Sequence, residues 1–358
     1  MPVTEVRVAN YRSLRDVQIP LGQVNVVLGA NGCGKTNLYR AMFLLHAAAR
    51  GELARTLAAE GGMPSVLWAG TRPKGPVRLI LGVVVDGFDY ELSCGLPEIN
   101  DLPSAFKLDP LIKEETVTFR DGCSRVTLLD RAKSGAVLRD ADGARVSFPR
   151  ALTRSESALT QIQEPQRFPP LFALRESLAG WRFYHSFRTD EDAPLRQPRV
   201  GSFTPVLGHD GTDLAAALLT IIEIGDADAL HAAVRRAFDG AILRVEGEDA
   251  RFHILLETPG LRRPLGAHEL SDGTLRYLCL LAALLSPRPP ALLALNEPET
   301  SLHPDLILPL AALIAEAGTR TQVWVTTHSA PLAEAVASRA GVGPVRLARR
   351  DGETVVLT

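Results

Sequence analysis

Residues 29–36 read Gly-Ala-Asn-Gly-Cys-Gly-Lys-Thr, and their types and spacing are suited to binding phosphate groups. They satisfy the pattern G-x-x-x-x-G-K-S/T, in which glycines let backbone N–H groups surround phosphate oxygens without a Cβ clash. Lys35 can reach the β- and γ-phosphates, and the Thr36 hydroxyl is suited to ligate Mg²⁺. The sequence therefore predicts that ATP or GTP binds here with Mg²⁺. The predicted nucleotide-binding residues of this segment are Asn31, Gly32, Gly34, Lys35, Thr36 and Asn37.

The elements around this loop have the order that the motif requires. The apolar run Val24–Leu28 predicts a buried strand before the loop, and Asn37–Ala49 predicts a helix after it. The helix N-terminus would add a partial positive charge beside the phosphates. The alternative is a glycine-rich turn that caps the helix and binds nothing, which requires a chance match to an uncommon pattern.

Three later segments place polar side chains at the ends of predicted elements. An apolar run, 291–295, predicts a buried strand that leads into 296–304, Asn-Glu-Pro-Glu-Thr-Ser-Leu-His-Pro. Asn296 and Glu297, the first two residues of this segment, would meet Mg²⁺ and an attacking water. Residues 269–274, Glu-Leu-Ser-Asp-Gly-Thr, open a predicted helix, where a serine and open N–H groups make an anion site. Residues 326–329, Thr-Thr-His-Ser, end another predicted strand.

The order of these motifs resembles that of the ABC-type ATPases. Within that superfamily, the chain most resembles the RecF/SMC-like and OLD-like AAA-family ATPases, through residues 10–14 (Asn-Tyr-Arg-Ser-Leu), 29–36, 270–273 and 297–304. The motifs extend from residue 10 to residue 329 and so frame nearly the whole chain. The resemblance implies an α/β P-loop NTPase of the ABC-ATPase type. Its mixed, parallel core sheet would be accompanied by an antiparallel β subdomain and a helical signature lobe.

The resemblance also implies roles for individual residues. Glu297 matches the general base that activates the hydrolytic water, and His328 matches the switch histidine that senses the γ-phosphate. Arg12 matches an N-terminal arginine that approaches the phosphates. Ser271 and Gly273 match signature residues that reach the γ-phosphate of the other subunit in an ATP-bound homodimer. The alternatives are an ordinary strand-end histidine, a surface arginine, and a serine that only caps its helix.

Asn296 departs from the family pattern, which usually has Asp at this position. An asparagine still accepts a hydrogen bond through its amide oxygen, but the negative charge beside the metal is lost. With Thr36 as the direct ligand and Asn296 as the second metal contact, we expect Mg–ATP to bind and hydrolysis to be slow. Gln161 and Gln163 are candidates for the glutamine of the superfamily's Q-loop because they precede the predicted signature lobe.

The motifs and local patterns predict three parts. Residues 1–95 and 288–358 form a nucleotide-binding lobe, 96–180 a β-rich insertion, and 181–287 a helical lobe with the signature motif. Short alternating runs bounded by turn residues predict the following β-strands: 77–85, 88–94, 116–120, 125–129, 136–139, 145–148, 241–246, 251–258, 345–348 and 354–357. A strand is also expected over 181–185, and helices over 155–163, 171–178, 212–224, 226–238 and 270–285.

Composition bounds the class of protein. Hydrophobic residues make up 46% and charged residues 22%, which is typical of a soluble globular protein, and no apolar run is long enough for a membrane span. The four cysteines, Cys33, Cys94, Cys123 and Cys279, lack metal-ligand spacing, which favours a reducing cytoplasm. The net charge of −2 does not indicate nucleic-acid binding. Three arginine clusters are either solvated surface or DNA contacts: Arg182, Arg188, Arg196 and Arg199; Arg262 and Arg263; Arg346, Arg349 and Arg350.

The leading functional hypothesis is an ATPase that works by ATP-gated homodimerisation in DNA repair or maintenance, or in anti-phage defence. DNA and a separate nuclease or effector protein are its candidate partners, and no membrane is expected. An alternative is a nucleotide-switched scaffold with negligible hydrolysis that regulates a partner protein, for which Asn296 is the main argument. A third is the nucleotide-binding subunit of a transporter. Residues 297–304, and Leu-Ser-Asp-Gly in place of Leu-Ser-Gly-Gly-Gln, argue against the transporter.

Overall fold

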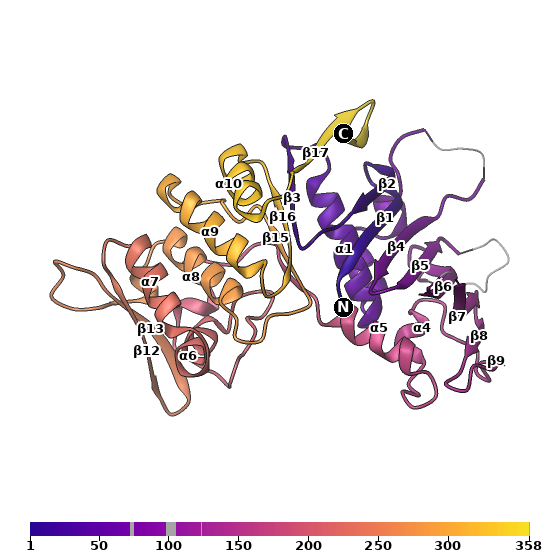
Figure 1. The fold of residues 1–358 in the computed structure, drawn as a ribbon, viewed down its shortest axis with the longest axis horizontal. Helices are drawn as coiled ribbons and strands as arrows, with labels where there is room; N and C mark the ends of the chain where they lie inside the picture. Colours follow the sequence, from indigo (N-terminus) through magenta and orange to yellow (C-terminus); the bar gives the residue numbers. More distant parts are fainter. Residues whose placement is uncertain (72–74, 98–104, 123, 358) are drawn as a thin grey trace. The chain divides into compact units, whose positions relative to one another are not determined.

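The computed structural model describes residues 1–71, 75–97, 105–122 and 124–357, and it contains two compact units (Figure 1). The first unit comprises Met1–Gly22, Gly29–Trp181 and Val345–Thr358. The second comprises Gln23–Leu28 and Arg182–Pro344. The boundaries of the three predicted parts stay a prediction.

An antiparallel sheet forms the framework of the first unit, with strand order β2-β1-β4-β5-β6-β7-β8-β9. Its strands are β1 Val3–Tyr11, β2 Leu14–Pro20, β4 Leu79–Val85, β5 Phe88–Gly95, β6 Leu111–Asp121, β7 Ser124–Ala132, β8 Gly135–Arg139 and β9 Arg145–Ser147. Asp86 and Gly87, with φ of 48° and 84°, make the two-residue turn between β4 and β5. Left-handed backbone at both positions matches the right-handed twist of the flanking strands, so the runs predicted as strands over 77–85 and 88–94 meet in a hairpin.

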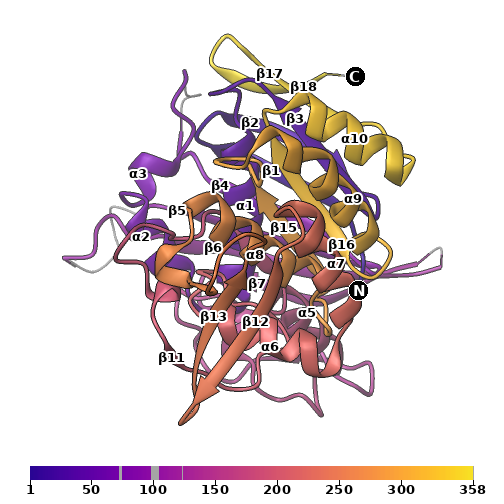
Figure 2. The ribbon, with the colours of Figure 1, turned by 90° about the vertical axis from the view of Figure 1, so that its left-hand side faces the viewer.

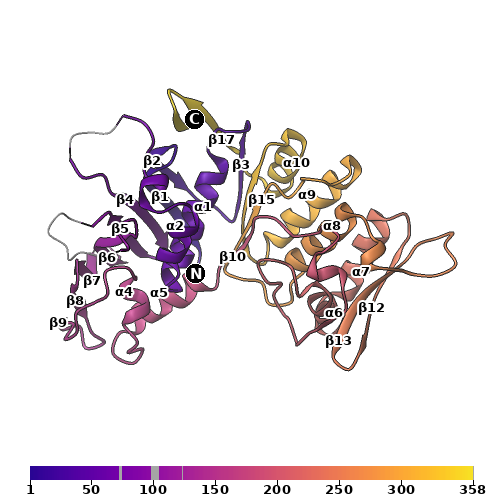
Figure 3. The same cartoon turned by 180° about the vertical axis from the view of Figure 1, so that it is seen from behind.

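Helix α1 (Lys35–Ala49) begins at the last two residues of the phosphate-loop pattern and lies against β1 and β4 (Figure 3). Leu38, Met42 and Leu45 lie at helical spacing within the predicted helix Asn37–Ala49, and all three are buried. The first unit also contains α2 Leu53–Ala59, α3 Met63–Val66, α4 Ala158–Gln161, α5 Pro169–Ala179 and the antiparallel hairpin of β17 Val345–Arg350 and β18 Glu353–Leu357.

A parallel sheet of order β10-β15-β16-β3 positions the motifs of the second unit. Its strands are β10 Arg182–Tyr184, β15 Leu292–Asn296, β16 Gln322–Thr327 and β3 Val24–Gly29. Leu295 is paired with Tyr184 and Val325, and Thr327 with Leu28. The carboxyl ends of the strands therefore lie along one edge, which is where open α/β sheets bind ligands.

Helices α9 (Ile307–Ala317) and α10 (Ala330–Ala340) pack against β16 of this sheet, and α8 (Asp272–Leu284), α7 (Ala227–Ala237) and α6 (Leu214–Ile224) pack on one another beyond them (Figure 2). A long antiparallel pair, β12 Ile242–Glu248 and β13 Arg251–Glu257, extends from them, with β11 Arg199–Val200 and β14 Leu265–Gly266 on β13. Short turns of 3₁₀-helix are η1 Pro194–Arg196, η2 Ala267–Glu269 and η3 Pro304–Leu306. The predicted mixed α/β fold is confirmed.

Three properties of the described residues concern membrane spans, cysteines and metal ligands. Within those residues, no helix combines the length and apolar character needed to cross a membrane. Cys33, Cys94 and Cys279 are buried, free thiols. Over the described ranges, no group of three or more His, Cys, Asp or Glu side chains is arranged to hold a metal ion.

Candidate nucleotide site

The phosphate loop curls around the side chain of its own lysine. Lys35 is 3% exposed, and its Nζ donates to the carbonyl oxygens of Gly29 and Ala30 at 2.8 and 3.1 Å. Gly32 and Gly34 have φ of 77° and 108°, a conformation that favours glycine. Gly34 is also the N-cap of α1 and has no side chain to occupy the first-turn N–H groups. The loop thus fits a triphosphate, with a helix N-terminus that no side chain caps and a buried cation.

The remaining predicted residues of this segment differ in their surroundings. Thr36 is partly buried in the first turn of α1, and Asn31 is exposed on the loop. Asn37 Nδ2 donates to Ser13 Oγ at 2.8 Å. The Asn37 amide is therefore engaged within the protein, and its predicted contact with the nucleotide stays a prediction.

Arg12 is held by a carboxylate that was not identified from the sequence. Its Nη2 donates to Glu60 Oε2 at 2.8 Å, and the Tyr11 hydroxyl donates to the same oxygen at 2.6 Å. Arg40 Nη1 lies 3.5 Å from Glu60 Oε1. Burial, followed by the charge of Glu60, raises the pKa of Tyr11. Arg12 therefore belongs to a local ion-pair cluster, and its approach to phosphates stays a prediction.

In the second unit, Asn296 is the last residue of β15 and Glu297 follows it at the carboxyl edge of the parallel sheet. Asn296 Oδ1 accepts a hydrogen bond from Thr326 Oγ1 at 2.8 Å. Glu297 has a left-handed backbone, with φ of 47°, and its N–H donates to Thr326 O at 2.8 Å. A non-glycine residue in this conformation costs about 1–3 kcal/mol, and such strain clusters at functional sites.

His328, the predicted switch residue, lies beside Glu297, the predicted base. Its Nδ1 lies 3.7 Å from Glu297 Oε1 and 3.3 Å from Glu299 Oε1. The nearly buried Glu299 carboxylate accepts hydrogen bonds from the N–H groups of His328 and Ser329 at 3.2 and 3.3 Å. Glu299 therefore fixes the turn that presents His328 to Glu297. The side chains of Glu297 and His328 remain 29% and 44% exposed, so both can be reached by water and substrate.

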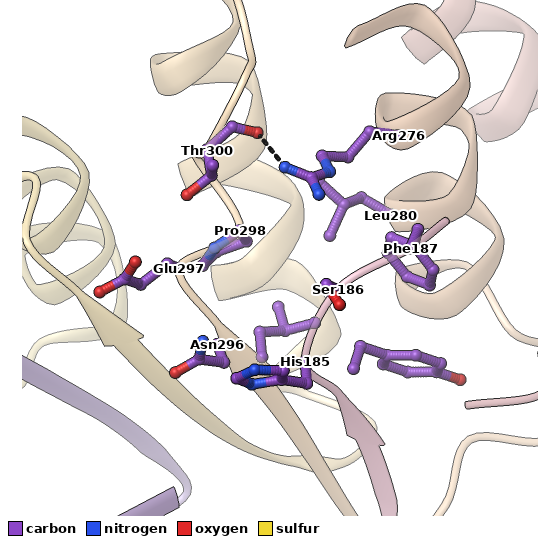
Figure 4. Close-up of a pocket in the computed structure, with 11 residues that line it drawn as sticks. His185, Ser186, Phe187, Arg276, Leu280, Asn296, Glu297, Pro298 and Thr300 are labelled. Atoms are coloured by element: carbon purple, nitrogen blue, oxygen red, sulfur yellow. Dashed lines mark hydrogen bonds between the residues drawn. The ribbon is translucent and has the colours of Figure 1, made fainter. Parts of the chain in front are cut away.

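A cavity of about 150 Å³ lies beside these residues (Figure 4). It is lined by Tyr184, His185, Ser186, Phe187, Arg276, Leu280, Leu295, Asn296, Glu297, Pro298 and Thr300. Because Tyr184 is paired with Leu295, the following residue, His185, comes beside Asn296, as Figure 4 shows. His185 was not identified as a site residue from the sequence. Its position at the end of the predicted strand 181–185 was the feature of the sequence that could have indicated a site residue.

The signature residues cap α8 and pack against the loop after Glu297. Ser271 is the N-cap of α8, and its Oγ accepts from Thr274 N–H at 3.1 Å. A Cβ at Gly273 would lie 2.7 Å from Ser301 O, so only glycine allows this close approach. Arg276 Nη1 also donates to Thr300 O at 2.9 Å (Figure 4). These contacts are intramolecular, and the contact of Ser271 and Gly273 with a second subunit stays a prediction.

Arg196 was expected on the surface, either solvated or in contact with DNA, and its burial shows that it is not a surface residue. The residue is 7% exposed, and its Nη1 donates to Leu270 O at 2.7 Å. Its Nη2 donates to Asp272 Oδ1 at 2.6 Å, and its Nε donates to Thr189 O at 2.9 Å. Arg196 therefore links the segment after β10 to the start of the signature helix. An arginine is buried only where its donors are paired, and those partners are distant in sequence.

The two candidate Q-loop glutamines make local hydrogen bonds in the first unit. Gln161 Nε2 donates to Thr153 O and Glu156 O at 3.0 and 2.9 Å, and Gln163 Nε2 donates to Thr160 O at 3.1 Å. These bonds stabilise the turns around α4. They give no support to a role for either residue at the nucleotide.

Comparisons with known proteins identify the family and the fold. The model of the family described as "AAA domain, putative AbiEii toxin, Type IV TA system" matches residues 24–333. No curated protein matches the chain in sequence. The structure is similar to an Smc head bound to the C-winged helix domain of ScpA, with 15% identity, coverage of 100% of this chain and 97% of that chain, and a TM-score of 0.51.

Two archaeal structures show the same fold. The Smc head of Pyrococcus furiosus, bound to the C-terminal domain of ScpA, has 14% identity, coverage of 99% and 96%, and a TM-score of 0.52. The Smc head of Pyrococcus yayanosii, with a coiled coil and joint, has 11% identity, coverage of 100% and 97%, and a TM-score of 0.51. At these identities the similarity shows the fold. The family match over residues 24–333 shows that the chain belongs to this AAA-domain family, which supports an ATP-binding ATPase.

Proposed function

We propose that the protein binds Mg–ATP at the phosphate loop and hydrolyses it slowly, with Glu297 as the general base. The observation that carries this proposal is the group formed by Glu297, His328 and Glu299 at the carboxyl edge of the parallel sheet. Glu297 accepts the proton of the attacking water, and His328 orients the carboxylate and contacts the γ-phosphate.

Lys35 and the first-turn N–H groups of α1 bind the phosphates in this proposal, and Thr36 is the direct Mg²⁺ ligand. When bound, Mg²⁺ neutralises charge on the phosphate oxygens. Asn296 supplies an amide oxygen without a negative charge, and that oxygen already accepts a hydrogen bond from Thr326. Both properties support slow turnover, because Asn296 stabilises the metal less than a negatively charged aspartate would.

We further propose that ATP binding joins two copies of the chain through Ser271 and Gly273. Ser271 is exposed at the N-terminus of α8, where an anion is favoured. The proposed role is in DNA repair or maintenance or in anti-phage defence in the cytoplasm, with DNA and a separate nuclease or effector protein as partners. The toxin–antitoxin wording of the family description supports defence, and the Smc heads bound to ScpA support a separate protein partner.

The second candidate is the nucleotide-switched scaffold, which Asn296 favours. ATP turnover and oligomeric state, measured with and without duplex and single-stranded DNA, distinguish the two. Turnover that DNA stimulates, together with salt-sensitive DNA binding, supports the DNA-linked ATPase. ATP-dependent dimerisation without measurable turnover, and without any response to DNA, overturns it in favour of the scaffold.

A further inference from the structure

A chain of hydrogen bonds joins the phosphate loop to the hairpin of β17 and β18 in the first unit. Asn37 Nδ2 donates to Ser13 Oγ at 2.8 Å, and Ser13 Oγ lies 2.7 Å from Thr354 Oγ1. Thr354 Oγ1 then donates to the carbonyl oxygen of Cys33 at 2.8 Å. Thr354 N–H also donates to Ser13 O at 2.8 Å, which fixes the hairpin beside Ser13.

The direction of these hydrogen bonds is determined by the number of protons available. Each hydroxyl has one proton to donate, and the proton of Thr354 goes to Cys33 O. Ser13 must therefore donate to Thr354 while it accepts from Asn37. Each hydroxyl therefore donates one hydrogen bond and accepts one, and the hydrogen bonds of the chain polarise one another.

Fixing the Cys33 carbonyl also fixes the next N–H group of the loop. The peptide between Cys33 and Gly34 is planar and trans, so its C=O and N–H point in opposite directions. Because Thr354 holds the carbonyl, the Gly34 N–H points away from Thr354. A phosphate loop needs such N–H groups aligned before the phosphate arrives, since ordering them during binding weakens affinity.

The packing around Gly34 shows how closely Thr354 approaches the loop. A Cβ built at Gly34 would lie 2.0 Å from Thr354 Oγ1 and 3.0 Å from Ser13 Oγ. Gly34 has φ of 108°, and Thr354 is 4% exposed. The glycine that the phosphate-loop pattern requires therefore also makes room for the two hydroxyls.

We propose that Thr354 and Ser13 are positioning residues for the nucleotide: they hold the Cys33–Gly34 peptide in the orientation that binds phosphate. This role rests on the proposed ATP binding at residues 29–36. It assigns a function to the β17–β18 hairpin that its sequence, outside every nucleotide-binding motif, does not indicate.

The test is the dissociation constant of mant-ATP, a fluorescent ATP analogue, measured with Mg²⁺ on the full chain. Thr354→Val keeps the shape but leaves Cys33 O without its donor, so we expect binding to weaken about tenfold. Thr354→Ser keeps the hydroxyl and should bind within about twofold of wild type. Thr4→Val is the matched control, because it removes an exposed hydroxyl from β1 and should leave binding unchanged.

Ser13→Ala tests the next member of the chain and should weaken binding about threefold. The Thr354→Val/Ser13→Ala double variant should bind no more weakly than Thr354→Val alone, because both changes break the same chain of bonds. Additive effects in the double variant, or wild-type affinity in Thr354→Val with its thermal midpoint retained, would overturn the proposal. If Thr354→Val does not fold, the mant-ATP affinity of Ser13→Ala tests the proposal instead. An affinity equal to that of wild type in Ser13→Ala would overturn it.

Failure of the proposed function gives a different result. In that case wild-type protein does not bind mant-ATP, or Lys35→Ala binds it as tightly as wild type. The positioning role then falls with the proposed function. Binding by the wild type that depends on Lys35 but not on Thr354 overturns the positioning role alone.

Discussion

Glu297 has a strained backbone and a neighbouring histidine, and it follows Asn296, an amide at the position where the resemblance implies an aspartate. Its φ of 47° directs the chain out of β15, and His328 Nδ1 lies 3.7 Å from its carboxylate. Both catalytic candidates could be predicted from the motifs, because their residue types and order are specific. Their distance could not be predicted, since it depends on Glu299, which binds the backbone at His328 and Ser329.

Asn296→Asp restores the charge that the family pattern supplies beside the metal. We expect it to raise the rate of ATP turnover about tenfold and to lower the Mg²⁺ concentration needed for half-maximal rate. Titration of steady-state turnover against Mg²⁺ measures both. Equal or lower turnover in the aspartate variant, with the fold retained, would mean that Asn296 does not limit hydrolysis.

Gly273→Ala tests the packing of the signature residues. The new Cβ would lie 2.7 Å from Ser301 O, so we expect a loss of about 1–3 kcal/mol in the free energy of unfolding. Gly343→Ala is the matched control in the same unit, because a Cβ there meets nothing within 4 Å. Urea unfolding of both variants compares them, and equal stability would contradict the packing described for Gly273.

At the scale of elements, the strands of the parallel sheet were well predicted. Parallel strands are buried on both faces, so they are continuous apolar runs such as Leu292–Leu295. The contacts that join elements were not predictable. Arg196, in η1, bonds to Leu270 and Asp272 at the start of α8, and Thr354, in β18, bonds to Cys33. Both sets of contacts form only when the tertiary structure brings these distant segments together.

Arg196→Met should destabilise the second unit, because it leaves the carbonyl oxygens of Leu270 and Thr189 without their donor. We expect a loss of about 2–4 kcal/mol in the free energy of unfolding. Arg199→Met, which changes an exposed arginine of β11, should cost less than about 0.5 kcal/mol. Chemical denaturation of the two variants tests the difference, and similar losses would show that Arg196 does not stabilise the signature segment.

At the scale of the whole molecule, the proposal requires two copies of the chain to associate when ATP is bound. Ser271→Arg places a long cation at the exposed start of α8, and we expect it to abolish ATP-dependent dimers while mant-ATP still binds. Ser202→Arg, at an exposed position before α6, is the matched control and should dimerise normally. Light scattering with ATP distinguishes these outcomes, and dimers of unchanged stability in Ser271→Arg would exclude Ser271 from the interface.

The most direct measurement of the central claim is ATP turnover by Glu297→Gln beside wild type and Glu223→Gln, which changes an exposed glutamate of α6. We predict slow turnover in wild type and in Glu223→Gln. In Glu297→Gln, turnover should fall at least about 100-fold while mant-ATP affinity is retained, because only the proton acceptor is lost. Turnover in Glu297→Gln equal to that of wild type would contradict the assignment of Glu297 as the general base.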